Sequence, residues 1–252
     1  MFNWKYINWT YIYDGSFEGL LTIVFDCYIN KKIPNKIVSE EEYMLNILDT
    51  CLYVKTNYEK SKRIVDGIVK NISYDVLYNS YNAFLSSKEF KEINILKYIL
   101  NGFVIGPKID TMLSIDYVLA VQKLKKNVLM EAHRLKGLVR LMEIKNNLFY
   151  ASIHPDNNII ENVGKFLIKR FPAQNLILHD KNRNIAMLYN QKEYSIIPVP
   201  CGININNFSE NELNFQKLWK TFFNSISIKE RTNKRLQMQF MPKRYWQDLI
   251  EI

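Results

Sequence analysis

The spacing of apolar residues predicts a mainly helical first half of the chain. A strand-like run, WTYIYDG at residues 9–15, comes first. Ser16 then precedes apolar residues at intervals of three and four, which is typical of a helix capped by a serine. Similar helical patterns recur at 61–72, 73–86 and 90–106. We therefore predict a mostly helical layer over residues 16–136.

Two further serines are predicted to begin helices. Ser39 with Glu42, and Ser209 with Glu212, have the spacing of a capping box, in which the serine hydroxyl and the acidic side chain bond the first backbone N–H groups. The second pair precedes a helical pattern at 210–226.

The longest helical pattern runs from about Asp110 to Lys136, and Gly137 is suited to end it. One side is apolar and the opposite side is basic. The apolar side carries Tyr117, Val121, Leu124, Val128 and Leu135, and the basic side carries Lys123, Lys126, His133 and Arg134.

After residue 137 the pattern changes to short runs rich in β-forming residues. These runs occupy 138–144, 148–154, 175–180, 184–190 and 193–200, and one helical pattern at 157–171 separates the second from the third. The order β-β-α-β-β-β predicts a small antiparallel or mixed sheet with one covering helix. The predicted fold class is α+β: a helical region at 1–136, a sheet unit at 137–200, and a C-terminal helix with a basic aromatic tail at 201–252. These three parts could equally form one compact domain.

Composition is typical of a folded chain, since 48% of the 252 residues are hydrophobic and 23% are charged. No apolar run approaches the roughly 20 residues that cross a membrane, and the start lacks the pattern of a secretory signal. We therefore expect a cytoplasmic protein without a membrane partner. The cysteines, Cys27, Cys51 and Cys201, are odd in number and far apart, which favours buried thiols over disulfides. We expect no metal and no cofactor.

The formal net charge of +9 favours a polyanionic partner, although a bias toward Ile, Asn, Lys and Tyr would also produce it. The cations concentrate in two places, the basic helix side with its continuation and the C-terminal tail. The predicted nucleic-acid contacts are Lys123, Lys126, Arg134, Lys136 and Arg140 in the first, and Arg231, Lys234, Arg235, Lys243, Arg244 and Tyr245 in the second. The alternatives are a solvated helix face and a tail whose aromatic residues, Phe240, Tyr245 and Trp246, dock into the core. Of these, we expect Phe240 and Trp246 to anchor the tail and Tyr245 to stack on a base.

The phosphate loop, dinucleotide turn, zinc helix and nucleophile elbow motifs are absent from the sequence. The candidate catalytic residues are His133, Asp156, His179 and Asp180, because histidines beside carboxylates can transfer protons or bind a metal. The structural alternative is that Asp156 or Asn157 caps the next helix and that Asp180 begins the turn DKNRN.

Four ordered blocks carry a family resemblance: YIYDGSFEGLLTIVFDCY, MEAHRLKGLVR, HPDNNII with FLIKRFPAQNLILHDKNR, and LWKTFFNSISIKERTNKRLQMQFMPKRYW. They resemble a bacterial family of probable DNA metabolism or DNA repair proteins. Matching positions include Asp14, Gly15, Phe17, Glu18 and Gly19, then His133, Arg134, Lys136 and Arg140, then Pro155, Asp156, Arg170, Gln174, Asp180 and Arg183, and finally Pro242, Lys243, Arg244, Tyr245 and Trp246. The family commonly has a carboxylate at the position of His154, and aromatic residues at those of Leu138 and Leu141.

The resemblance implies a partner radical-SAM protein and an association with a uracil-DNA glycosylase-like protein, and it implies no established reaction. Together with the two basic blocks, it leads to the hypothesis of a DNA-binding accessory protein in DNA repair or modification. The alternatives are a lesion-processing enzyme, such as a glycosylase or hydrolase, and a protein adaptor that does not bind DNA. Phosphate contacts do not distinguish DNA from RNA.

Overall fold

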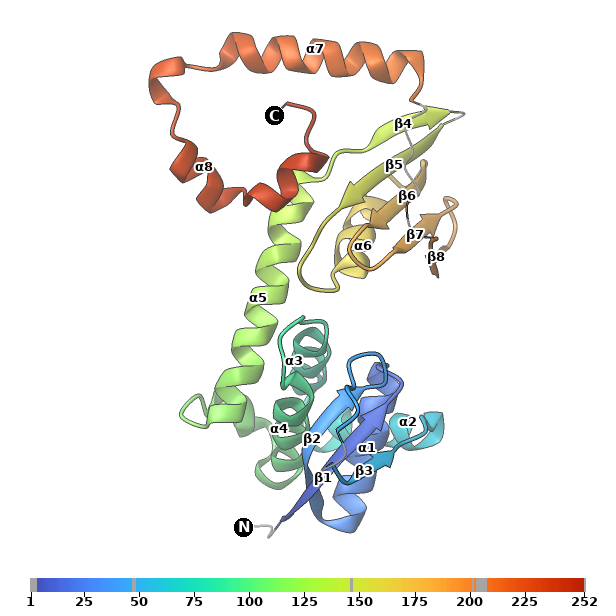
Figure 1. Cartoon of the computed structure of the whole chain (residues 1–252), viewed down its shortest axis with the longest axis vertical. Helices are drawn as coiled ribbons and strands as arrows, with labels where there is room; N and C mark the ends of the chain where they lie inside the picture. The colour runs from blue at the N-terminus through green and yellow to red at the C-terminus, as the bar shows by residue number, and fades with distance from the viewer. Residues whose placement is uncertain (1–3, 47–48, 146, 201, 203–207, 252) are drawn as a thin grey trace. The chain divides into compact units, whose positions relative to one another are not determined.

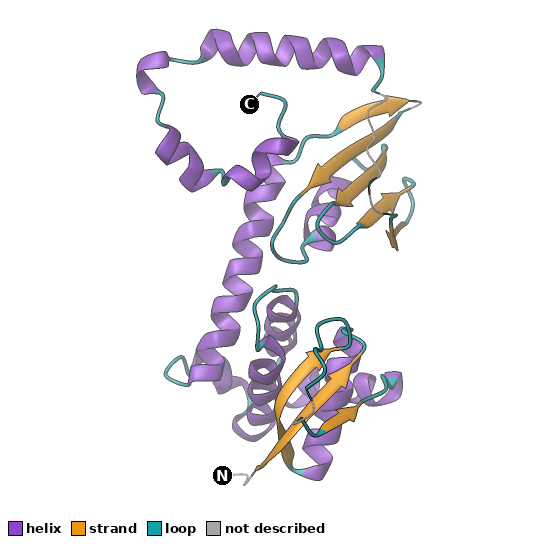
Figure 2. Cartoon of the chain, viewed as in Figure 1, coloured by secondary structure: helices purple, strands orange, loops and turns teal. Residues whose placement is uncertain are grey.

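The computed structural model describes residues 4–46, 49–145, 147–200, 202 and 208–251. The chain forms two compact units, residues 1–128 and 129–252, and the boundary lies within helix α5 (Asp116–Leu138). Each unit combines helices with a β-sheet (Figures 1 and 2), so the α+β fold class is confirmed. Within the described residues, no helix is long and apolar enough to cross a membrane.

The first unit contains a three-stranded parallel sheet in the order β2–β1–β3. Its strands are β1 (Lys5–Tyr13), β2 (Lys32–Ser39) and β3 (Cys51–Tyr53), and α1 (Phe17–Asn30) connects the first two. The hydroxyl of Ser16 accepts the N–H of Gly19 at 2.9 Å, which confirms the predicted helix cap.

The capping box predicted at Ser39 is wrong. Ser39 is the last residue of β2, and its carbonyl accepts the N–H of Glu42 at 3.2 Å in a turn. Parallel pairing with β1 along most of β2 outweighs the local helix signal, and Pro34 hides the strand in the sequence. Proline is tolerated there because β2 is an edge strand.

Three further helices of this unit agree with the predicted patterns: α2 (Tyr58–Asn71), α3 (Tyr74–Phe84) and α4 (Lys91–Ile105). The long helix α5 begins at Asp116 and not at about Asp110, because the short 3-10 helix η1 (Pro107–Thr111), which was not predicted, precedes it. The apolar faces of α2, α3 and α4 bury Ile68, Val76 and Ile99 completely, together with Leu20 and Ile23 of α1. Cys27 is buried as expected and Cys51 is partly buried, whereas Cys201 lies outside the described residues.

The second unit contains a mixed sheet, one of the two predicted kinds, with the strands in the order β4–β5–β6–β7–β8. The strands are β4 (Met142–Lys145), β5 (Leu148–Ile153), β6 (Asn175–Asp180), β7 (Ile185–Tyr189) and β8 (Tyr194–Pro198). Only the β5–β6 pair is parallel among these strands, and α6 (Ile160–Arg170) connects it and contacts β6 and β7. Side chains between α6 and the sheet, such as Val163 and Leu178, are fully or almost fully buried.

The C-terminal part consists of α7 (Glu210–Ile226), η2 (Lys229–Arg231), α8 (Lys234–Phe240) and η3 (Lys243–Asp248). The capping box predicted at Ser209 and Glu212 forms in half: the hydroxyl of Ser209 accepts the N–H of Glu212 at 3.1 Å, but the N–H of Ser209 donates to the carbonyl of Glu143. The carboxylate of Glu212 accepts the N–H of Glu143 at 3.1 Å, which ties the start of α7 to β4.

Candidate nucleic-acid interface

Three distant stretches of the second unit meet at one buried carboxylate, Glu131 of α5, whose side chain is 5% exposed. Its Oε2 accepts the N–H of Asn157 at 2.9 Å and the side-chain amide of Asn157 at 2.6 Å. Its Oε1 accepts the N–H of Asp156 at 3.0 Å, the hydroxyl of Tyr245 at 2.6 Å and Nη2 of Arg244 at 3.1 Å. We call these five residues the Glu131 network.

The Glu131 network keeps a carboxylate charged inside the protein. Burial alone would raise the pKa of Glu131, but the hydrogen bonds from Tyr245 and from Asp156 and Asn157 outweigh it, so the pKa lies below its ordinary value. Arg244 also pairs with the exposed carboxylate of Asp156 at 2.9 Å. The network therefore fixes the loop after β5 and the segment η3 against α5.

The network corrects the expected role of Asp156 and Asn157. Neither caps α6, which begins at Ile160 with Ile159 at its N-cap and no side-chain cap hydrogen bond. The backbone N–H groups of Asp156 and Asn157 bond Glu131 instead. A sequence signal existed, since Glu131 is an acidic residue three and four positions from Val128 and Leu135 of the apolar side, where a charge needs a partner.

The network also corrects the expected role of Tyr245, which was predicted to stack on a base. Tyr245 is 1% exposed, so its ring is inaccessible in this structure, and it fastens the C-terminal segment to the fold. Phe240, one of the two expected anchors, is 66% exposed. Trp246 is partly buried, and its Nε1 donates to the carbonyl of Met241 at 2.8 Å.

A second polar cluster lies at the carboxyl ends of the parallel strands β5 and β6. Asp248 of η3 accepts the hydroxyl of Ser152 at 2.6 Å and lies 2.9 Å from Nδ1 of His154. In β6, Nδ1 of His179 lies 3.1 Å from the hydroxyl of Tyr150, and its Nε2 is buried without a hydrogen-bond partner among the described atoms. Burial, followed by the charges of a nearby lysine and histidine, lowers the pKa of His179, so its ring is neutral at pH 7.

The side chains of the four candidate catalytic residues have different surroundings, although Arg183 donates both to the carboxylate of Asp180 and to the backbone carbonyl of Asp156. His133 is exposed on α5, Asp156 is exposed and paired with Arg244, and His179 is buried beside Tyr150. Asp180 is buried and accepts the N–H groups of Asn182 and Arg183, the turn that the structural alternative expected. Burial raises the pKa of Asp180 against the charge of Arg183, which pairs with it at 3.1 Å. Over the described ranges, no three His, Cys, Asp or Glu side chains are grouped to hold a metal ion.

The predicted phosphate contacts divide into exposed and internally paired cations. Lys123 and Lys126 are exposed on the part of α5 that belongs to the first unit, and Arg134 is partly buried in the second. The tail residues Arg231, Lys234, Arg235 and Lys243 are exposed. In contrast, Arg140 donates to the carbonyls of Gly137 and Leu138 and to Glu251, and Arg244 belongs to the Glu131 network.

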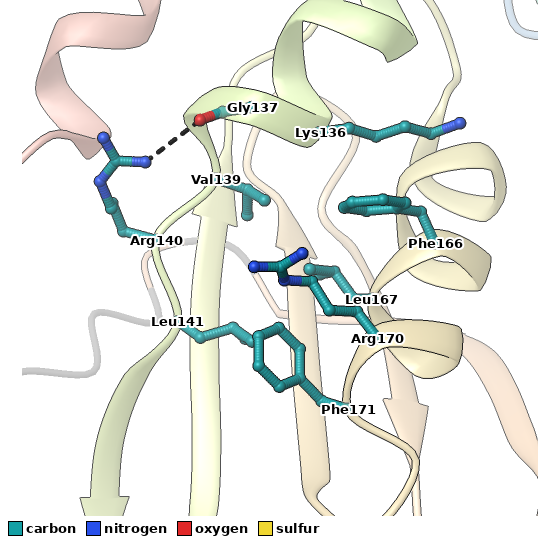
Figure 3. A pocket seen from close by; sticks show the side chains of 9 residues that line it. All are labelled: Lys136, Gly137, Val139, Arg140, Leu141, Phe166, Leu167, Arg170 and Phe171. Atoms are coloured by element: carbon teal, nitrogen blue, oxygen red, sulfur yellow. Dashed lines mark hydrogen bonds between the residues drawn. The ribbon is translucent and has the colours of Figure 1, made fainter.

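A pocket of about 480 Å³ lies between the end of α5, the segment that follows it, and α6. Arg170 is exposed and its guanidinium points into the middle of the pocket in Figure 3, whereas the guanidinium of Arg140 points toward the carbonyl of Gly137. Its lining contains cations, apolar side chains and two phenylalanines but no carboxylate: Lys136, Gly137, Val139, Arg140, Leu141, Phe166, Leu167, Arg170 and Phe171.

The cations of this pocket lie near its aromatic rings. Nζ of Lys136 is 5.7 Å from the ring centroid of Phe166, and Cζ of Arg170 is 5.6 Å from that of Phe171. Neither cation forms an ion pair within the described part of the chain. We call the residues that line this cavity the Arg170 pocket; its chemistry suits an anion attached to a planar apolar group.

The fold and these two sites define an α+β protein whose second unit carries a fixed C-terminal segment and a cationic aromatic pocket. A family model described as a domain of unknown function, DUF4130, matches residues 89–251, which include the Glu131 network and the Arg170 pocket. Because the match covers well over half of the chain, the chain belongs to this family.

Two further comparisons add little. A search of curated proteins finds no match. Among solved structures, the chain is similar to a pGpG-specific phosphodiesterase, PggH, from Vibrio cholerae, with a TM-score of 0.35 and 9% sequence identity over 72% of this chain and 81% of that one. A likeness this low carries no functional conclusion.

Proposed function

We propose that the protein binds DNA as an accessory protein in DNA repair or modification, acting with a radical-SAM protein and associated with a uracil-DNA glycosylase-like protein. The observation that supports DNA binding most directly is the Arg170 pocket, where Lys136 and Arg170 lie beside aromatic rings without a carboxylate partner. Cations that are not paired internally can exchange their counterions for phosphate at little cost.

The exposed tail cations extend the proposed phosphate surface. Arg231, Lys234, Arg235 and Lys243, with Arg134 of α5, are further proposed phosphate contacts of the second unit. Lys123 and Lys126 are proposed contacts of the first unit and are considered separately. Arg140 and Arg244 are left out because internal carboxylates and carbonyls hold their guanidinium groups.

Fluorescence anisotropy with short single- and double-stranded DNA across a salt series tests this proposal. Log affinity falls with log salt concentration, and each phosphate contact makes this fall steeper by about 0.7–0.9. Lys136→Ala and Arg170→Ala should therefore each weaken binding and make the fall shallower by about that amount. Lys165→Ala is the matched control, because Lys165 lies on the same helix α6 but pairs with Glu161 at 2.7 Å. No binding at low salt, or an equal effect of all three variants, would contradict the proposal. The same assay with RNA strands of matched sequence tests whether the protein prefers DNA to RNA.

A protein adaptor is the second candidate, and the apolar face of α7 favours it. Phe215, Leu218, Phe222 and Ile226 follow helical spacing, and each is more than half exposed. If α7 binds the radical-SAM partner, co-purification should be lost in Phe215→Ser with Phe222→Ser, and retained in Tyr74→Ser, which changes a similarly exposed aromatic residue of α3. Retained co-purification of the α7 variant would exclude α7 as the contact.

We do not extend the proposal to catalysis by His133, Asp156, His179 and Asp180. The side chains of Asp156, His179 and Asp180 bond different groups, His133 is exposed, and the lining of the Arg170 pocket includes none of the four. A lesion-processing reaction would need them to converge on one reacting atom.

A further inference from the structure

We infer that the Arg170 pocket binds a single unpaired nucleotide, with the phosphate at Arg170 and the base against Phe171 and the apolar wall. This inference rests on the proposed DNA binding and specifies the part of the nucleic acid that the pocket takes. It concerns one nucleotide and not the duplex, because an aromatic ring can contact a base face only when the base is unstacked.

The pocket has the dimensions and lining that such a ligand requires. Its volume of about 480 Å³ lies within the roughly 300–1,000 Å³ of small-molecule sites. Val139, Leu141, Leu167 and Phe171 form an apolar wall, and Figure 3 shows the side chains of Leu141 and Phe171 in one layer. Phe171 is held in place directly after α6, since its N–H donates to the carbonyl of Leu167 at 2.8 Å.

Arg170 is placed for a phosphate. Its planar fork can donate two parallel hydrogen bonds to phosphate oxygens, whereas the ammonium of Lys136 lies near Phe166 and points away from Arg170 in Figure 3. Arg140 has a different role: its hydrogen bonds to the carbonyls of Gly137 and Leu138 hold the segment that forms the apolar wall. Gly137 leaves its side of the pocket open, because a Cβ atom added there would meet no atom within 4 Å.

The same nucleotide chemistry has two sources, an unpaired residue within or at the end of a DNA strand and a free mononucleotide. Duplexes that carry a single unpaired 2-aminopurine, with and without a 5′-phosphate, supply the first source, and a blunt duplex is their reference. Free deoxynucleoside monophosphates, deoxynucleosides and inorganic phosphate, measured by calorimetry on the full chain, supply the second.

The fluorescence of 2-aminopurine should be quenched on binding. The duplex with the unpaired nucleotide, called the overhang duplex below, should bind more tightly than the blunt duplex. Stacking contributes roughly 1–3 kcal/mol per base, so Phe171→Leu, which fills similar space without an aromatic face, should weaken overhang binding about 5- to 150-fold. Arg170→Ala should remove the preference for the 5′-phosphate, and Lys165→Ala should leave both effects unchanged.

Each outcome separates this inference from the proposed function. If blunt and overhang duplexes bind equally with a normal salt slope, and Phe171→Leu has no effect, the pocket inference is overturned while DNA binding stands. If inorganic phosphate competes as well as the nucleotide, the base contact is refuted. If mononucleotides bind at the pocket but no DNA binds, the pocket inference holds for free nucleotides and the proposed function fails.

Discussion

Replacement of Glu131 by glutamine tests whether the Glu131 network fixes the second unit. A glutamine can keep one oxygen for the three donors at Oε1, which come from Asp156, Arg244 and Tyr245. Its NH₂ group would then face the two donors of Asn157 that now bond Oε2. The substitution therefore replaces two hydrogen bonds by opposed donors and removes the charge that Arg244 faces.

Two estimates give the free energy that the Glu131→Gln substitution should cost. Hydrogen bonds to charged groups contribute about 1.5–3 kcal/mol each, so the loss of two corresponds to about 3–6 kcal/mol. Removing one partner of a buried ion pair costs roughly 3–5 kcal/mol. We therefore expect Glu131→Gln to lower the local free energy of opening by about 4 kcal/mol.

Native-state hydrogen exchange measures this loss where it occurs, because the amides of Asp156 and Asn157 are themselves donors to Glu131. About 4 kcal/mol corresponds to roughly a thousandfold faster exchange of these two amides. The control is Glu161→Gln, which removes a carboxylate that is 28% exposed and paired with Lys165, and which should change stability by about 0.5 kcal/mol or less. A change below tenfold at Asp156 and Asn157, or an equal change in the control, would refute the reasoning.

Three further predictions concern other features. The pKa of Glu131 is lowered from its ordinary value of 4.5, so the charged carboxylate stabilises the fold above that pH, and this stabilisation is lost as the pH falls through the lower pKa of the folded state. The difference in unfolding free energy between wild type and Glu131→Gln should therefore shrink below about pH 4.5. Unfolding curves at several pH values would show this. Gly19→Ala should lower the free energy of unfolding by about 1–3 kcal/mol, and with it the melting temperature, because the added methyl group would collide with three side chains. Gly137→Ala should not lower the melting temperature, because the added methyl group would meet open space. Burial, with a nearby aspartate, raises the pKa of Cys27 to about 12, so iodoacetamide should label Cys51 much faster than Cys27 in the folded protein, as peptide mapping would show.

The sequence predicted the second unit better than the first. Alternating and continuous apolar runs marked all five strands from β4 to β8, and Ser209 marked the start of α7. The strands β2 and β3 were missed because β2 contains a proline and β3 is only three residues long, and parallel partners far away in the sequence stabilise both. Local propensity cannot report such pairing.

The sequence also predicted only part of the Arg170 pocket and of the Glu131 network, because contacts between distant parts of the chain form both. Lys136 was named from the continuation of the basic side of the long helix. Phe171 was not named, because only the fold brings the end of α6 beside the end of α5. Tyr245 was placed on the outside since tyrosine suits both stacking and packing, and the deciding partner, Glu131, lies 114 positions earlier.

That separation along the chain matters during synthesis. Until residue 245 has left the ribosome, Glu131 lacks the hydroxyl of Tyr245 and the guanidinium of Arg244, and its burial would leave a poorly compensated charge. We expect nascent chains, and products truncated before residue 244, to leave α5 and the loop after β5 undocked and open to proteases. Docking of α5 and the loop after β5 is therefore coupled to the synthesis of η3, because residues 244 and 245 supply two of the donors to Glu131.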